Sequence, residues 1–180
     1  MKTTYLFTSE RLGFRNWSKD DLTEFAEMNA DHQVMEHFPN PLTIKESEEF
    51  MNRLQEHYKN YGYNYFATEI LETGELIGFI GLANQKYVSK FTPATDIGWR
   101  LKKSAWEMGY ATEGAKRCLS YAFQTLNLDR IIATCTAVNF KSEHVMKKLG
   151  MIKLGTFKHP KLVDHPNYEK CLCYEIKQPI

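Results

Sequence analysis

The chain lacks the features that mark membrane, secreted or nucleic-acid-binding proteins. No apolar run is long enough to span a bilayer, and the N-terminus loses its apolar character too early for a signal peptide. The 23 basic and 22 acidic residues leave a formal net charge of +1, so no strong positive field favours a polyanion. These absences predict a soluble cytoplasmic protein that binds neither nucleic acid nor membrane.

Cysteine and histidine also lack the spacing of a metal centre. The chain contains four cysteines and no C-x-x-C pair or other closely spaced set of His and Cys ligands. Cys118 lies in a helical pattern, whereas Cys135, Cys171 and Cys173 lie in strand patterns. We therefore expect reduced thiols in the core or on the surface, and neither disulfides nor a bound metal.

The composition that remains is that of one globular domain. With 180 residues, 43% of them apolar, the chain can bury a sizeable core, and no repeat or linker divides residues 1–180. Hydrophobic periodicity predicts a mixed α/β (α+β) domain with a mostly antiparallel sheet of about seven strands and about four helices. The predicted helices span residues 20–29, 43–61, 111–126 and 141–149, and the predicted strands span 11–15, 65–71, 76–84, 95–101, 130–136, 151–157 and 172–176.

Residues 106–114, Trp-Glu-Met-Gly-Tyr-Ala-Thr-Glu-Gly, are the most informative segment. They connect a predicted strand to a predicted helix, and the free N–H groups and dipole of a helix N-terminus favour an anion. A nucleotide P-loop is excluded because Ala115 separates Gly114 from Lys116, and Arg117 stands where a hydroxyl is needed. The GxGxxG fingerprint of dinucleotide-binding domains is absent as well.

This segment resembles the coenzyme-A pyrophosphate turn, Gln/Arg-x-x-Gly-x-Gly/Ala, of the GNAT acetyltransferase superfamily. It is most similar to the branch of ribosomal-protein N-terminal acetyltransferases (RimJ/RimL type), which commonly reads Trp-Gly-x-Gly-Tyr-Ala-Thr-Glu-Ala. The chain departs from that pattern at Glu107, usually Gly, and at Gly114, usually Ala. Residues 8–15, 96–101 and 139–151 resemble three further segments of the branch, in the same order.

The resemblance implies acetyl-CoA as cosubstrate, no metal, and a splayed pair of parallel strands that binds the cofactor. Backbone N–H groups of the turn would bind the pyrophosphate, strand backbone would pair with the pantetheine arm, and an amide near Ile97 or Gly98 would stabilise the oxyanion. The Asn139 side chain would hold the pantetheine, unless it is an ordinary loop or cap residue. The implied cofactor-binding residues are Ile97, Trp99, Leu101, Met108, Gly109, Tyr110, Ala111, Thr112, Asn139 and Ser142.

Two residues are candidates for proton transfer. In many members of the superfamily a Tyr protonates the departing thiolate, but here Met146 occupies that position, so the resemblance points to Ser142 instead. A water relay or a simple helix-capping role for Ser142 remains open. Asp96 is the candidate general base, with a salt bridge or solvated strand position as the alternative and Glu69 in reserve. We assign no role to the histidines.

The predicted activity is acetyl transfer from acetyl-CoA to a primary amine by direct attack in a ternary complex. The amine would be a protein N-terminal α-amine or a small molecule such as a polyamine, amino acid or aminoglycoside, and the protein a monomer or homodimer. The acceptor should lie against the early helices and the loop before the last strand. Aromatic residues there could line its pocket or merely pack: Trp17, Phe38, Tyr63, Tyr65 and Tyr168. A non-catalytic module that binds or senses acetyl-CoA is the alternative, left open by Glu107 and Met146.

Overall fold

One eight-stranded sheet forms the centre of the molecule, with strand order β1-β2-β3-β4-β5-β6-β8-β7. The computed structural model describes residues 4–178. All neighbouring strands are antiparallel except β5 and β6, which are parallel. The strands are β1 (Phe7–Thr8), β2 (Leu12–Arg15), β3 (Tyr65–Ile70), β4 (Leu76–Gln85), β5 (Ala94–Leu101), β6 (Arg130–Thr136), β7 (Ile152–Lys158) and β8 (Lys170–Lys177). The predicted mixed α/β sheet is confirmed, with the two-residue β1 as an additional strand.

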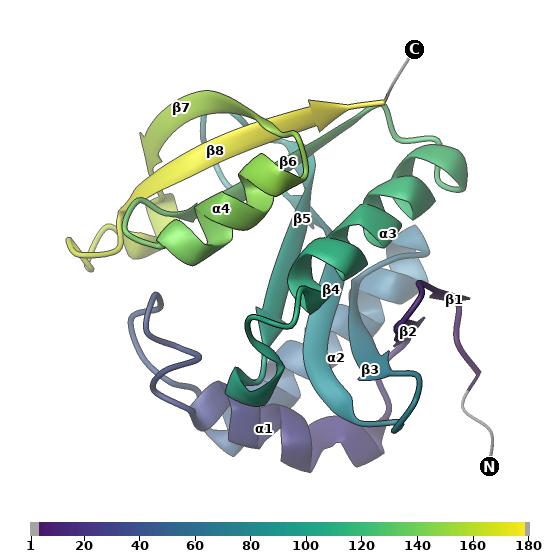
Figure 1. Cartoon of the computed structure of the whole chain (residues 1–180). Coiled ribbons are helices and arrows are strands. Elements are labelled where there is room, and N and C mark those ends of the chain that lie inside the picture. Colours follow the sequence, from purple (N-terminus) through teal and green to yellow (C-terminus); the bar gives the residue numbers. More distant parts are fainter. Residues whose placement is uncertain (1–3, 179–180) are drawn as a thin grey trace.

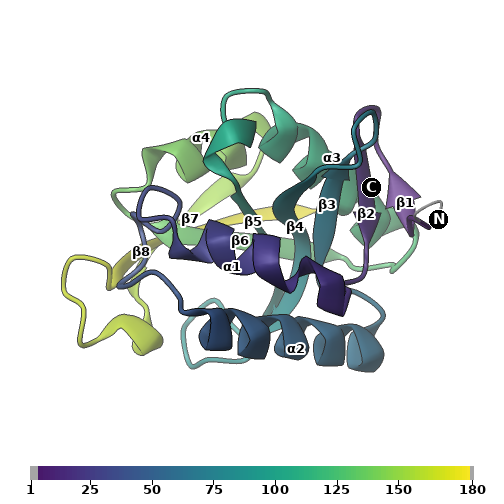
Figure 2. The same ribbon diagram turned by 90° about the horizontal axis from the view of Figure 1, so that it is seen from below.

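Four α-helices cover the two faces of this sheet. They are α1 (Leu22–Ala30), α2 (Ile44–Tyr61), α3 (Tyr110–Gln124) and α4 (Phe140–Lys148). Helices α1 and α2 lie on one face, and α3 and α4 lie on the other (Figures 1 and 2). The capping box predicted for α2 is present, because Thr43 and Glu46 exchange side-chain and backbone hydrogen bonds. The same helix ends at Gly62, whose φ of +77° suits glycine.

The period-2 alternation of the strands sends apolar side chains into two separate cores. Ile80 of β4 and Ile97 of β5 pack with α3 in the larger core. Phe79 of β4 packs with Phe25 of α1 and Met51 of α2 in the smaller core on the opposite face. Both faces of the central strands are therefore covered, which explains why their sequences are largely apolar.

The parallel strands β5 and β6 are paired at a single position, Asp96 opposite Ile132. Figure 1 shows the two strands diverging beyond that point toward their carboxyl ends. Leu101 and Thr136, at those ends, therefore lie across a gap in the sheet. The splayed parallel pair that the resemblance implies is thus present, and its open edges leave backbone groups unpaired on both strands.

Candidate active site

A cleft of about 790 Å³ opens where β5 and β6 diverge. It extends from the loop after α1, across β5, to the N-termini of α3 and α4. Met108 is 54% exposed and lies outside the lining. The other predicted site residues all line the cleft, from β5 (Asp96, Ile97, Trp99 and Leu101), from the turn and α3 (Gly109, Tyr110, Ala111 and Thr112) and from the start of α4 (Asn139 and Ser142).

The turn before α3 exposes an uncapped helix N-terminus. Gly109 is the N-cap residue, with a φ of +80°, and no side chain caps it. By contrast, Thr43 caps α2 and Asn139 caps α4 through side-chain oxygens. The first-turn N–H groups of α3 are therefore free for an anion, as the sequence predicts.

Glu113 in the first turn of α3 is turned away from this anion position and anchors the helix. Its carboxylate accepts hydrogen bonds from Ser9 Oγ at 2.7 Å, from the Arg11 amide at 2.8 Å and from Arg11 Nε at 2.7 Å. Burial raises the pKa of this carboxyl, but these hydrogen bonds outweigh burial and hold the pKa below its usual value. Glu113 thus positions the turn.

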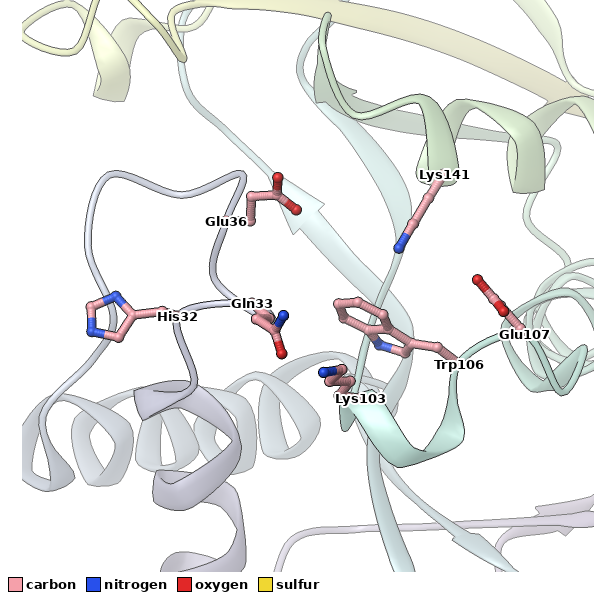
Figure 3. Close-up of a pocket in the computed structure, with 7 residues that line it drawn as sticks. All are labelled: His32, Gln33, Glu36, Lys103, Trp106, Glu107 and Lys141. Atoms are coloured by element: carbon pink, nitrogen blue, oxygen red, sulfur yellow. The ribbon is translucent and has the colours of Figure 1, made fainter.

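Glu107 adopts a left-handed backbone conformation, with a φ of +62°. It lines the cleft and also a neighbouring pocket of about 550 Å³ (Figure 3). In that pocket the Lys141 ammonium lies 4.4 Å from the centre of the Trp106 ring, and Lys103 contributes a second positive charge. Glu107 therefore has cationic neighbours around the turn, and the glycine usual at this position in the resembling branch suits such a φ.

Asp96 is buried at the point where β5 meets β6, and two side chains hold its carboxylate. Tyr65 Oη donates to Oδ1 at 2.7 Å, and Gln85 Nε2 donates to Oδ2 at 3.1 Å. Burial raises the pKa of Asp96 to about 6, against the opposing effect of these hydrogen bonds. The Tyr65 ring covers Gly98, where a Cβ would lie only 3.0 Å from the ring. A carboxylate with this pKa can exchange a proton near neutral pH.

Asn139, and not Ser142, caps helix α4. Asn139 Oδ1 accepts the backbone N–H of Ser142 at 3.0 Å, so the interpretation of Ser142 as the cap is wrong. The Ser142 side chain is half-buried in the cleft lining, one helical turn before Met146, which is 1% exposed. The alternative that Asn139 is a cap residue is correct for its carbonyl oxygen.

Several other candidates lie away from the cleft. Glu69 is paired with Arg15 at 2.5 Å and accepts a hydrogen bond from Tyr5, so it is occupied elsewhere in the fold. Trp17 belongs to the smaller core. Neither Tyr63 nor Tyr168 lines the cleft, whereas Phe38 and Tyr65 do.

The cysteines carry no catalytic signature. All four are free thiols. Burial raises the pKa of Cys135 to about 12 and that of Cys171 to about 11, which keeps both protonated at neutral pH. Residues 4–178 contain no cluster of three potential metal ligands and no helix long and apolar enough to cross a bilayer.

Arg100 also lines the cleft, although it was not among the predicted site residues. His37 and His159, for which no role is predicted, lie in the lining as well. Burial lowers the pKa of both imidazoles, so they are largely neutral at pH 7. Arg100 follows Asp96 by four residues on one strand, and this period-2 spacing was the available signal.

Comparison with known proteins identifies the family. Residues 11–152 match the family model described as an acetyltransferase (GNAT) domain. The chain is 36% identical over 154 residues to the uncharacterized N-acetyltransferase YnaD of Bacillus subtilis. This match covers 84% of this chain and 85% of that protein. The chain belongs to the GNAT acetyltransferase family.

Solved structures give the same result for the fold. A GNAT-family acetyltransferase from Bacillus anthracis superposes with a TM-score of 0.77 at 31% identity, over 94% of this chain and 96% of that one. A ribosomal-protein-S5-alanine acetyltransferase from Vibrio fischeri superposes with a TM-score of 0.74 at 22% identity, over 96% and 98% of the two chains. The second likeness concerns the fold alone.

Proposed function

We propose that the protein transfers the acetyl group of acetyl-CoA to a primary amine by direct attack in a ternary complex. The supporting observation is that the uncapped N-terminus of α3 and the Asp96 carboxylate open into the same cleft, along the unpaired edge of β5. The residues fit acetyl-CoA: the first-turn N–H groups suit a pyrophosphate, and unpaired strand edges suit the amides of pantetheine.

The chemistry assigns a role to each candidate. The neutral amine attacks the thioester carbonyl carbon, and the backbone near Ile97 or Gly98 binds the oxyanion. Asp96 accepts the proton that the amine loses, through a water molecule. The C–S bond then breaks, and the thiolate takes a proton from Ser142 or from water. The backbone from Met108 to Thr112 binds the pyrophosphate, while Ile97, Trp99, Leu101 and Asn139 hold the pantetheine.

We place the chain in the RimJ/RimL-type branch of the family, on the strength of its sequence motifs, and in the cytoplasm. Residues 1–180 would act as one unit, as a monomer or homodimer, without metal, membrane or nucleic acid. The acceptor in this proposal is a protein N-terminal α-amine or a small amine.

A panel of amines with thiol detection tests the proposal. Purified protein and acetyl-CoA are mixed with each amine, and release of the free CoA thiol is followed against an amine-free control. Amine-dependent release, with acetylated product seen by mass spectrometry, supports the enzyme and excludes the non-catalytic module. Binding of acetyl-CoA without turnover on any amine would favour a sensing module instead. A melting temperature unmoved by acetyl-CoA would exclude both functions.

A further inference from the structure

Arg100 is a partly buried cation in the cleft, and no acidic side chain of residues 4–178 is paired with it. Its Nη1 donates to Asn29 Oδ1 at 2.7 Å, and its Nε is a buried donor that no group of residues 4–178 accepts. No ion pair within that part of the chain includes Arg100. A guanidinium has five N–H donors, so most of its hydrogen-bonding capacity is left open.

Aromatic rings surround the guanidinium. Its central carbon lies 4.3 Å from the ring centre of Phe38, 5.4 Å from that of Phe79 and 5.8 Å from that of Phe50. Burial lowers the pKa of Arg100 to about 10, which still leaves the side chain charged at neutral pH. Cation–π contacts stabilise such a charge only in part, and an uncompensated buried charge is unfavourable. The site therefore suits an incoming anion.

The carboxylates that line the cleft are engaged elsewhere. Asp96 accepts hydrogen bonds from Tyr65 and Gln85, while Glu36 is 67% exposed and lies 3.9 Å from His37. Glu107 lies at the turn beside Trp106 (Figure 3). None of them forms an ion pair with Arg100 among the residues that the structure describes, so the counter-charge is missing from this part of the cleft.

Arg100 and Asp96 share one face of β5. Residues 96, 98 and 100 alternate with Ile97 and Leu101, which point into the core around α3. Gly98 lies between them, and the Tyr65 ring covers the strand surface at this glycine. Four residues of strand place the two Cα atoms about 13 Å apart. Asp96, Tyr65 and Arg100 all line the cleft, so a single small molecule that lies along the Tyr65 ring can present an amine toward Asp96 and an anion toward Arg100.

We propose that Arg100 binds a carboxylate of the acceptor, so that the acceptor carries both an amine and a carboxylate. This inference rests on the proposed function. It disfavours polyamines, because a second ammonium group would meet the positive charge of the guanidinium. The acceptor is then a free amino acid, or a peptide whose N-terminal residue is Asp or Glu; both present the same chemistry.

Matched acceptors test the inference without any substitution. ω-Amino carboxylates of increasing chain length are compared with the corresponding ω-amino amides, and peptides that begin with Asp or Glu with those that begin with Asn or Gln. A charged hydrogen bond predicts about 10- to 100-fold higher kcat/KM for the carboxylates at the best length, mainly through KM. Equal kcat/KM for carboxylate and amide in both series would overturn the inference and leave the acetyltransferase proposal intact.

Variants then assign the preference to Arg100. R100Q should abolish the carboxylate preference, and R100K should retain only part of it because it loses the planar fork. The matched control is R53Q, because Arg53 stacks on the same Phe50 ring at 5.6 Å but is exposed and outside the cleft. R53Q should keep the full preference. A preference unchanged in R100Q would contradict the inference.

Two further readouts separate the possible failures. The shift in melting temperature with acetyl-CoA shows whether each variant is folded. If R100Q does not fold, the acceptor preference is measured with R100K instead. Melting shifts with the amino carboxylate against its amide, measured with CoA bound, test carboxylate binding even without turnover. No turnover on any amine, with the carboxylate still preferred in binding, would defeat the proposed function and keep the inference.

Discussion

Glu107 is the residue at which this chain departs most clearly from the pattern it resembles. Its left-handed backbone, with a φ of +62°, costs a residue with a Cβ about 1–2 kcal/mol. Its carboxylate also lies in the turn that would bind the pyrophosphate, where negative charge is unfavourable. Two separable effects, strain and charge, therefore act at one position.

Replacing Glu107 in two ways separates these effects. Glu107→Gly should raise the free energy of unfolding by up to about 1 kcal/mol, because relief of strain exceeds the entropy that glycine adds to the unfolded chain. Glu107→Gln keeps the strain but removes the charge. Both should tighten acetyl-CoA binding a few-fold, about 0.3–1 kcal/mol at an exposed helix terminus. Denaturant unfolding measures the stability, and calorimetric titration measures the affinity for acetyl-CoA. Equal stability of the Gly and Gln variants would contradict the strain argument.

The Asp96 carboxylate sets the expected pH dependence of activity. As the base it must be ionised, so kcat/KM should rise with pH through about 6, the value to which burial raises its pKa. Asp96→Asn should lower kcat about 100-fold and abolish this limb. A pH–rate profile of both proteins from pH 5 to 9 gives the answer. If kcat/KM of D96N still rises with pH through about 6, a titrating group other than Asp96 causes the rise.

The same carboxylate predicts a pH-dependent difference in stability. The pKa of Asp96 is about 6 in the folded protein against 3.8 for an unperturbed aspartate, so the folded state holds its proton more tightly. Its contribution to stability is present below pH 4 and is lost as the pH rises through 6. The free energy of unfolding of D96N relative to wild type should therefore increase by about 2 kcal/mol between pH 4 and pH 8. A difference independent of pH would show that Asp96 titrates normally.

Ser142 has a free hydroxyl at the candidate thiolate position because Asn139 supplies the cap of α4. If this hydroxyl protonates the thiolate, Ser142→Ala should lower kcat by about 100-fold without changing the dissociation constant of acetyl-CoA. Ser120→Ala on α3 is the control, since Ser120 bonds to Gln124 and lies outside the cleft. Steady-state kinetics with a saturating amine measure the effect. An unchanged turnover number would assign the proton to water.

Among the elements, α3 approaches the sheet unusually closely at Gly114. A Cβ added there would lie 2.4 Å from Ile80 Cδ1 and 3.3 Å from Leu12 and Phe14. The branch that the chain resembles usually has Ala at this position, so Ile80 and Gly114 are complementary in this protein. The close approach also fixes the helix whose N-terminus forms the anion site.

Gly114→Ala should destabilise the protein by about 1–3 kcal/mol, because overpacking outweighs the gain in helix propensity. Ile80→Val removes the Cδ1 atom that would clash and costs about 0.5–1.5 kcal/mol alone. The double variant should therefore be more stable than the sum of the two single effects predicts. Denaturant unfolding of wild type, the two single variants and the double variant gives the coupling energy. Additive effects would show that α3 moves away from the sheet in Gly114→Ala, rather than clashing with Ile80.

Elements with local signals were predictable, and contacts between distant segments were not. The α2 capping box and Gly62 fixed that helix at both ends because the signal lies within a few residues. The cap of α4 was assigned to Ser142 as readily as to Asn139, since both can accept an N–H. Arg100 went unnoticed because its surroundings, Asn29 and Phe38, come from α1 and the loop after it.

At the scale of the whole molecule, the sheet is two parts that meet at one backbone pair. Strands β1 to β5 form one part and β6 to β8 the other, and Asp96 opposite Ile132 is the pairing between them. Beyond that pair, alternate amides of β5 face the gap without a strand partner. The candidate base therefore lies at the junction, and the gap that would take the cofactor lies beside it.

This arrangement predicts where acetyl-CoA should change hydrogen exchange. In the free protein, amides of residues 98–101 should exchange faster than those of β3 and β4, which are paired on both sides. Bound acetyl-CoA should slow residues 98–101 and 109–112, because pantetheine fills the gap and pyrophosphate covers the turn. Adenosine 3′,5′-bisphosphate, which lacks pantetheine, should protect the turn alone, and strands β7 and β8 should be unaffected by either ligand. Mass spectrometry of peptic fragments resolves these segments. Protection of the turn without residues 98–101 under acetyl-CoA would mean that the pantetheine does not enter the gap between β5 and β6.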